Sequence, residues 1–127
     1  MGARPVTRPT ILVVDDHGGF RATAKRLLES DGWAVVGEAI DGSSAMAAAA
    51  ALAPDVVLLD IGLPDVDGFV VAERLAAAAD APSIILVSSR DHEAYRERVQ
   101  ASPVAGFIPK DRLDGAALRS LVGEALR

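Results

Sequence analysis

The chain has 127 residues, half of them apolar, so it is long enough to form one domain with its own core. It contains no cysteine, which excludes disulfides and thiolate metal sites, and no apolar stretch of the roughly 20 residues that a membrane span requires. The net charge of -5, without a basic run, argues against nucleic-acid binding by this chain itself.

Residues 1–9 are predicted to be a flexible tail, and because nothing in them resembles a signal peptide we expect a cytoplasmic protein without membrane contact. Residues 10–127 are predicted to form a single domain. Short apolar runs rich in β-branched residues predict five buried strands, at Thr10–Val14, Trp33–Ala39, Val56–Leu59, Ser83–Val87 and Ala105–Ile108. Helical spacing and capping residues predict five helices. The first contains Phe20, Ala24, Leu27 and Leu28 and is ended by Asp31-Gly32, and the others lie at Ser43–Leu52, Asp67–Ala78, Asp91–Gln100 and Leu118–Ala125.

Strand and helix alternate five times along this sequence. Such alternation is typical of an α/β fold in which helices cover both faces of a doubly wound parallel sheet. The segment Asp91–Gln100 is highly charged and has only Tyr95 and Val99 as apolar anchors. We therefore expect it to be a weak, exposed helix.

Polar residues follow four of the five predicted strands. In an open parallel sheet, ligands bind beyond the carboxyl ends of the strands. The residues expected to converge there are Asp15 and Asp16, Asp60, Ser88 and Lys110. This placement predicts one site with three carboxylates, a hydroxyl and an ammonium group.

Three neighbouring carboxylates need a cation in order to stay ionised together. Oxygen ligands alone favour a hard ion, so we expect Mg²⁺, with Mn²⁺ as a possible substitute, held by Asp15, Asp16 and Asp60. In a simpler alternative, Asp15 and Asp16 only cap the first helix. That alternative leaves Asp60, Ser88 and Lys110 unexplained.

This set of residues resembles the receiver domain of bacterial two-component response regulators. Asp15-Asp16 match the acidic pair, and Asp60 matches the phosphoacceptor within "DIGLPDVDG". Ser88 matches the hydroxyl position, Lys110 the lysine, and Phe107 the aromatic switch position. The stretch "GFIPKD" resembles the subfamily with a helix-turn-helix output domain. Asp111 follows Lys110 where the broader pattern has proline, so a cis-proline after the lysine is impossible.

The resemblance implies a flavodoxin-like sheet of strand order 2-1-3-4-5 and the transfer of a phosphoryl group from a sensor histidine kinase to Asp60. Lys110 and Ser88 would each pair with a phosphoryl oxygen, and the backbone carbonyl of Gly62 would be a further metal ligand. Ser88 and Phe107 would form the switch, and Gly62 and Arg90 would modulate the lifetime of the acyl phosphate. The chain would assist its own phosphorylation and dephosphorylation without being an enzyme for another substrate.

The resemblance also implies an output surface on Asp91–Gln100, the fifth strand and the last helix, which could support a homodimer. Transcription regulation through an output domain absent from this chain is the leading expectation. The alternatives are a stand-alone receiver that acts through protein contacts and a degenerate receiver that works without phosphate. A phosphohydrolase with an aspartate nucleophile is a further rival, but Gly62 occupies the position where such enzymes usually need an acid or base.

Two histidines are left out of the predicted site. His17 follows the acidic pair and is interpreted as an exposed residue at the start of a helix rather than as a ligand. His92 lies among charged residues and is interpreted as solvated surface.

Overall fold

The computed structural model describes residues 8–90 and 92–123 of the chain. Most of the predicted tail, Asp91 and Ala125 lie outside the described residues. Among the helices of the described residues, none combines the length and the apolar character that a bilayer crossing requires.

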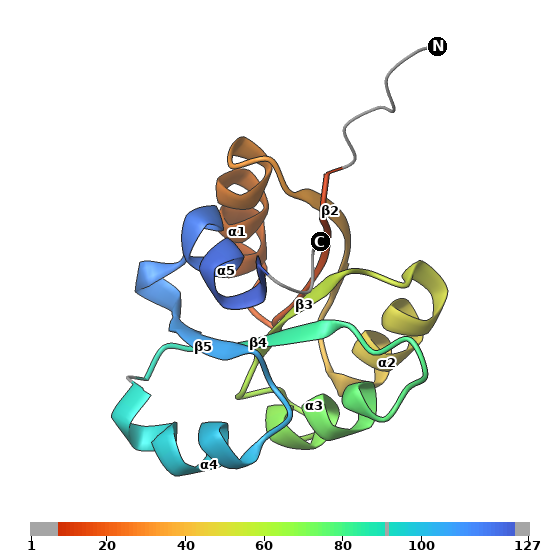
Figure 1. Cartoon of the computed structure of the whole chain (residues 1–127), viewed down its shortest axis with the longest axis vertical. Helices are drawn as coiled ribbons and strands as arrows, with labels where there is room; N and C mark the ends of the chain where they lie inside the picture. Colours follow the sequence, from red (N-terminus) through yellow and green to blue (C-terminus); the bar gives the residue numbers. More distant parts are fainter. Residues whose placement is uncertain (1–7, 91, 124–127) are drawn as a thin grey trace.

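Five parallel strands form one sheet in the order β2-β1-β3-β4-β5, which confirms the predicted fold class (Figure 1). Each strand begins and ends within one residue of its predicted bounds. The strands are β1 Thr10–Val14, β2 Ala34–Ala39, β3 Val56–Asp60, β4 Ser83–Ser88 and β5 Gly106–Pro109.

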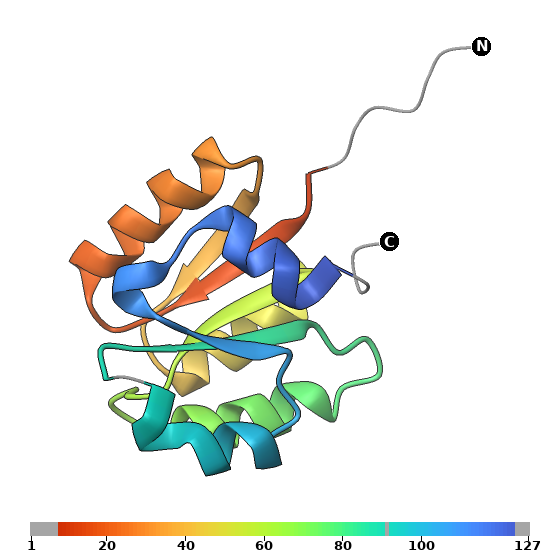
Figure 2. The same ribbon diagram turned by 60° about the vertical axis from the view of Figure 1, so that its left-hand side comes forward.

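Helices cover both faces of the sheet, as Figures 1 and 2 show. One face carries α1 Gly18–Ser30 and α5 Gly115–Val122. The other carries α2 Gly42–Leu52, α3 Gly68–Ala76 and the short α4 Arg96–Ala101.

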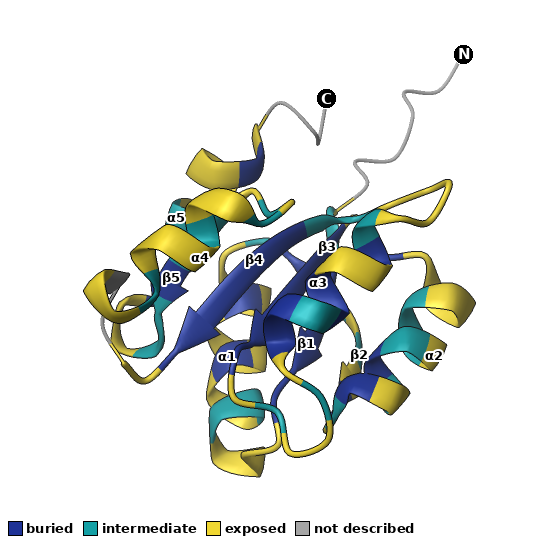
Figure 3. Cartoon of the chain, turned by 90° about the horizontal axis from the view of Figure 1, so that it is seen from below, coloured by how far each residue is buried: buried dark blue, intermediate teal, exposed yellow. Residues whose placement is uncertain are grey.

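The sheet has a continuous apolar interior because its central strands are buried on both faces (Figure 3). Successive side chains of a strand point to opposite faces, so each strand contributes to two core layers. In β1, for example, Ile11 and Val13 pack toward α1 and α5, whereas Leu12 and Val14 pack toward α2 and α3. This arrangement explains the unbroken apolar runs in the sequence.

Aspartates begin three of the helices. Asp41 accepts a hydrogen bond from the backbone N–H of Ser44, and the Ser44 hydroxyl group completes a capping box. Asp67 accepts from Phe69 N, and Asp114 accepts from Ala117 N. These caps satisfy N–H groups that have no partner within the helix, and they set where each helix starts.

The weak helix predicted over Asp91–Gln100 is only partly confirmed. A 3₁₀ helix, η1 His92–Tyr95, leads into α4, and no residue of α4 is buried. One anchor is polar and was not predicted: the Arg98 guanidinium group lies 2.8 Å from Asp67 Oδ2 and 4.1 Å from the centre of the Phe69 ring. A second short 3₁₀ helix, η2 Lys110–Arg112, follows β5 and was also not predicted.

Trp33 lies just before β2 rather than within it. Its side chain is fully buried among α1, α5 and the sheet, and its Nε1–H donates to the carbonyl oxygen of Gly115 at 3.3 Å. The ring thus fills the core near the amino ends of the strands, whereas the polar residues lie at their carboxyl ends. The sequence alone could not assign this role, since Trp33 is an equally good strand residue.

Candidate functional site

The carboxyl end of β1 presents the acidic pair. The backbone N–H of Asp15 still donates to the carbonyl oxygen of Ala39 in β2, which holds this residue at the edge of the sheet. Its side chain is fully buried, whereas that of Asp16 keeps 34% of its surface exposed. The two neighbouring carboxylates therefore meet very different environments.

Asp60 ends β3, next to β1, and is only 4% exposed. One of its oxygens, Oδ1, accepts a hydrogen bond from the backbone N–H of Gly62 at 3.3 Å. The start of α3 presses against the same turn, because a Cβ on Gly68 would lie 2.5 Å from the Asp60 carbonyl oxygen. Glycine at position 68 is thus required for the close approach that fixes the Asp60 backbone.

Lys110, at the end of β5, reaches both buried acids. Its Nζ lies 2.6 Å from Asp15 Oδ2, 3.6 Å from Asp60 Oδ2 and 4.7 Å from the centre of the Phe20 ring. Asp15 Oδ2 has no other partner among the described residues, and its contact with Nζ lacks hydrogen-bond geometry. One ammonium group is thus shared by the carboxylates of Asp15 and Asp60.

The pKa of Asp60 is raised above its ordinary value. Burial is the main cause, and the negative charge of Asp15 adds to it, with a smaller contribution from Asp16. Lys110 and the N–H of Gly62 act in the opposite direction but do not outweigh burial and Asp15. The three carboxylates of the cluster outnumber the one ammonium group beside them, and a bound cation would correct this imbalance of charge.

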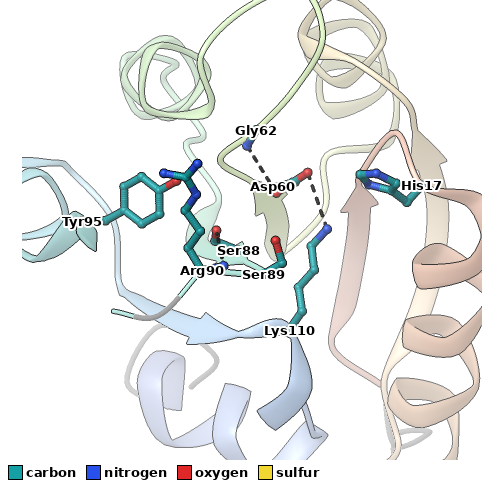
Figure 4. A pocket seen from close by; sticks show the side chains of 8 residues that line it. All are labelled: His17, Asp60, Gly62, Ser88, Ser89, Arg90, Tyr95 and Lys110. Atoms are coloured by element: carbon teal, nitrogen blue, oxygen red, sulfur yellow. Dashed lines mark hydrogen bonds and ion pairs between the residues drawn. The ribbon is translucent and has the colours of Figure 1, made fainter. Parts of the chain in front are cut away.

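Ser88 ends β4 and is almost entirely buried. Its Oγ accepts a hydrogen bond from the backbone N–H of Arg90 at 3.1 Å, so the hydroxyl group and the loop beyond it are connected. Ser89 and Arg90 are exposed at the rim. Together with Asp60 and Lys110, these residues face a cleft of about 340 Å³ (Figure 4).

Phe107 does not line this cleft. It is partly buried on the α3 and α4 side of the core, and its ring centre lies 6.3 Å from that of Tyr95. Tyr95 does line the cleft, and it also contacts Phe69 of α3, with ring centres 6.1 Å apart. Tyr95 was predicted only as an apolar anchor of a helix, and its position in the cleft beside Ser88 and Arg90 was not predicted.

His17 is exposed at the start of α1, as predicted, but its ring also lies beside the acidic pair. Its ring Nδ1 lies 3.0 Å from Asp15 Oδ1 and 3.2 Å from Asp16 Oδ1, and the side chain lines the cleft. Adjacency to the acidic pair was the available signal, but the direction of an exposed side chain cannot be read from sequence. The side chain of His92 lies outside the described residues.

The acidic cluster fits a divalent cation. One ligand atom from each of Asp15, Asp16, His17 and Asp60 lies within 4.8 Å of the others. Carboxylate oxygens are the ligands that Mg²⁺ prefers. The excess of carboxylate groups in the cluster is consistent with an ion at this place.

Comparisons with known proteins agree with this geometry. A family model described as "Response regulator receiver domain" matches residues 11–122. The response regulator GacA of Pseudomonas viridiflava is 32% identical over 118 residues, which cover 92% of this chain and 53% of that protein. The signal receiver domain of NarL from Mycobacterium tuberculosis superimposes with a TM-score of 0.84 at 32% identity, covering 95% of this chain and 98% of that structure.

The relatives also include an enzyme. A protein-glutamate methylesterase/protein-glutamine glutaminase of Myxococcus xanthus is 42% identical over 99 residues, which cover 77% of this chain but 28% of the relative. This chain thus spans about half or less of the length of these curated relatives.

Proposed function

Because this chain belongs to the family of response regulator receiver domains, we propose that Asp60 accepts a phosphoryl group from the phosphohistidine of a sensor histidine kinase. The supporting observation is the Asp60 carboxyl group, which is almost fully buried at the sheet edge with Lys110 Nζ 3.6 Å away. In this step an Asp60 oxygen bonds to phosphorus and the phosphorus–nitrogen bond breaks. The imidazole leaves with the bonding electrons and takes up a proton.

The other site residues would hold the phosphoryl group in line and neutralise its oxygens, which is the main task in phosphoryl transfer. Lys110 supplies a compact charge on a flexible stem to one oxygen, and the Ser88 hydroxyl group donates a hydrogen bond to another. Mg²⁺ would be held by Asp16, Asp60 and the carbonyl of Gly62, with Asp15 direct or through water. When bound, it supplies positive charge to the transferring group.

Ser88 would then carry the signal away from Asp60. Its hydroxyl group can donate to a phosphoryl oxygen while its Oγ keeps the hydrogen bond from Arg90 N, so inward movement of Ser88 draws the loop with it. Phe107, behind Tyr95, would repack as that loop moves. Gly62 and Arg90, at the mouth of the cleft, would set how easily water reaches the acyl phosphate.

The proposed output surface comprises α4, β5 and α5. No side chain of α4 is buried, and elements with few buried side chains are displaced at low cost. This surface would support a homodimer. Transcription control is the proposed output of the whole protein, because curated relatives are named as transcription regulators.

The proposal is tested by incubating the chain with Mg²⁺ and a small acyl phosphate and measuring intact mass. We expect the addition of one phosphoryl group, loss of this addition in Asp60→Asn, and its retention in Asp80→Asn. Asp80 is a suitable control because it is an exposed carboxyl group remote from the cleft.

Other results of the same assay would identify the rivals. Continuous turnover of several phosphate esters would indicate a hydrolase. No adduct, with partner binding retained, would indicate a receiver that works without phosphate. Amide hydrogen exchange is compared before and after phosphorylation. A larger increase in exchange in α4 than in α2 would support the proposed output surface, and unchanged exchange in α4 would exclude it.

A further inference from the structure

We propose that His17 is a nitrogen ligand of the cation bound at the acidic cluster, and that it shifts the site toward transition metals such as Mn²⁺ and Co²⁺ relative to Mg²⁺. This inference rests on the proposed function only in assuming that a divalent cation binds between Asp16 and Asp60. It concerns a residue that the family resemblance does not assign to the metal.

The backbone holds the His17 ring near the acids. The backbone N–H of His17 donates to Asp15 Oδ1 at 2.8 Å, which closes a tight turn directly before α1. His17 occupies the N-cap position of α1, but its side chain makes no capping hydrogen bond. The ring is therefore not engaged by the helix and lies over the carboxylates instead.

The distances suit a shared ion. An ion with bonds of about 2.1 Å holds opposite ligands about 4.2 Å apart. The four ligand atoms of the cluster, including one ring nitrogen, already lie within 4.8 Å of one another. The ring Nδ1 of His17 lies 3.0 Å from Asp15 Oδ1 and 3.2 Å from Asp16 Oδ1, close to the roughly 3.0 Å that separates adjacent ligands of such an ion.

The positive charge of Lys110 does not compete for the same position. Its Nζ lies against Oδ2 of Asp15, whereas the backbone N–H and the ring Nδ1 of His17 lie against Oδ1. The two oxygens of this carboxylate thus face different partners. A cation beside Oδ1 and Asp16 is separated from the ammonium group by the carboxylate itself.

The simpler alternative is that the ring only donates a hydrogen bond from Nδ1 to Asp15 or Asp16. The geometry permits it, because a neutral imidazole carries its proton on either nitrogen. When a cation is present, however, the form with the proton on Nε2 offers a lone pair at Nδ1. The exposed side of the ring can then donate Nε2–H to water.

A nitrogen ligand changes metal preference in a defined direction. Carboxylate and water ligands suit Mg²⁺ and Mn²⁺, whereas imidazole adds affinity mainly for transition metals, in the order Mn²⁺ below Co²⁺ below Ni²⁺. Loss of His17 should therefore weaken Co²⁺ and Mn²⁺ binding more than Mg²⁺ binding. A purely structural role would weaken all three ions alike.

The test compares wild type, His17→Gln and His92→Gln by calorimetric titration with Mg²⁺, Mn²⁺ and Co²⁺ in one buffer. His92 is the other histidine of the chain and serves as the matched control. We expect His17→Gln to lose about tenfold or more in Co²⁺ affinity, a loss typical of weakened metal shells, with Mg²⁺ affinity within about twofold of wild type. His92→Gln should bind every ion as wild type does.

Pulsed electron paramagnetic resonance of bound Mn²⁺ gives an independent measurement. A directly bound imidazole should produce nitrogen modulation in wild type and His92→Gln, and none in His17→Gln. Bound Mn²⁺ without nitrogen modulation, or an equal loss for all three ions, would overturn the inference while leaving the proposed function intact. No divalent binding by the wild-type chain would instead overturn the magnesium-dependent function itself.

Discussion

Nζ of the partly buried Lys110 lies 2.6 Å from Oδ2 of the fully buried Asp15, although most of the chain separates the two residues in sequence. They meet because β1 and β5 both end at the same edge of the sheet, on either side of β3 and β4. Asp60 lies between them, 3.6 Å from the same ammonium group. The charge of Lys110 is thus shared by two carboxylates, and several predictions about the site depend on this sharing.

Replacing Lys110 by methionine should slow phosphorylation from a small acyl phosphate by about 100-fold, the usual cost of removing one group that stabilises transition-state charge. The pKa of Asp60 should also rise further, because Lys110 lowers it in the wild type. Rates are measured by intact mass against time. Lys25→Met removes the only other lysine, an exposed residue of α1, and should leave the rate unchanged. A wild-type rate in Lys110→Met would show that the ammonium group does not act on the phosphoryl group.

Asp60→Asn should raise the melting temperature of the metal-free protein near neutral pH. The pKa of Asp60 is raised in the folded state, so the fold binds this proton more tightly than the unfolded chain does. The contribution of the protonated Asp60 carboxyl group to stability is greatest below its pKa in the unfolded chain, about 3.9. This contribution is lost as the pH rises through the pKa of Asp60 in the folded state. The benefit of asparagine should therefore shrink as the pH is lowered.

Thermal unfolding of both proteins across this pH range checks the sign, and Asp80→Asn is the control for a general change in charge. Adding Mg²⁺ should stabilise the wild type and narrow the difference, because a ligand that binds only the folded state raises its stability. A lower melting temperature for Asp60→Asn in metal-free buffer would contradict the prediction.

Asp65→Asn should have the opposite pH dependence. Asp65 accepts hydrogen bonds from Gly42 N at 2.7 Å and Ser43 N at 3.1 Å, and these hold the loop after Asp60 against the start of α2. The N–H of Gly42 is the largest cause of its lowered pKa. The Asp65 carboxylate stabilises the fold at pH values above its pKa in the unfolded chain. This stabilisation is lost as the pH falls through its lower pKa in the folded state.

The difference in melting temperature between wild type and Asp65→Asn should thus be largest near neutral pH and should vanish in acid. Urea unfolding at a series of pH values measures the same dependence. If the difference in stability between the two proteins is the same at every pH, the charge of Asp65 does not contribute to the hydrogen bonds with Gly42 and Ser43.

Gly68→Ala should destabilise the fold by about 2 kcal/mol, a typical cost of overpacking, and should disturb phosphorylation. The new Cβ would meet backbone atoms, 2.5 Å from Asp60 O and 2.7 Å from Ile61 Cα, and neither can turn aside as a side chain could. Gly62→Ala is the matched control in the same loop. A Cβ there has no atom within 4 Å, so its stability should stay within about 0.5 kcal/mol of wild type. Equal stability losses in denaturant titrations of the two variants would refute this reading of the loop.

The fold was largely predictable because its signals are local and repeated. The runs 11–14 and Val56–Leu59 are apolar at every position, which only a strand covered on both faces requires. The aspartates before α2, α3 and α5 mark helix starts through their own hydrogen bonds. The helix predicted over Asp91–Gln100 was predicted less well, because its anchors include contacts from Arg98 to Asp67 and Phe69 at the start of α3.

The sequence by itself determined that Asp15, Asp16, Asp60, Ser88 and Lys110 share one edge, since parallel strands all end on the same side of a sheet. Only the tertiary structure decided which neighbours join them. His17 and Tyr95 turn into the cleft while Phe107 packs behind it. The Tyr95 ring is placed by contacts with Phe69 and Phe107, which belong to other elements, and no local pattern of residues carries that information.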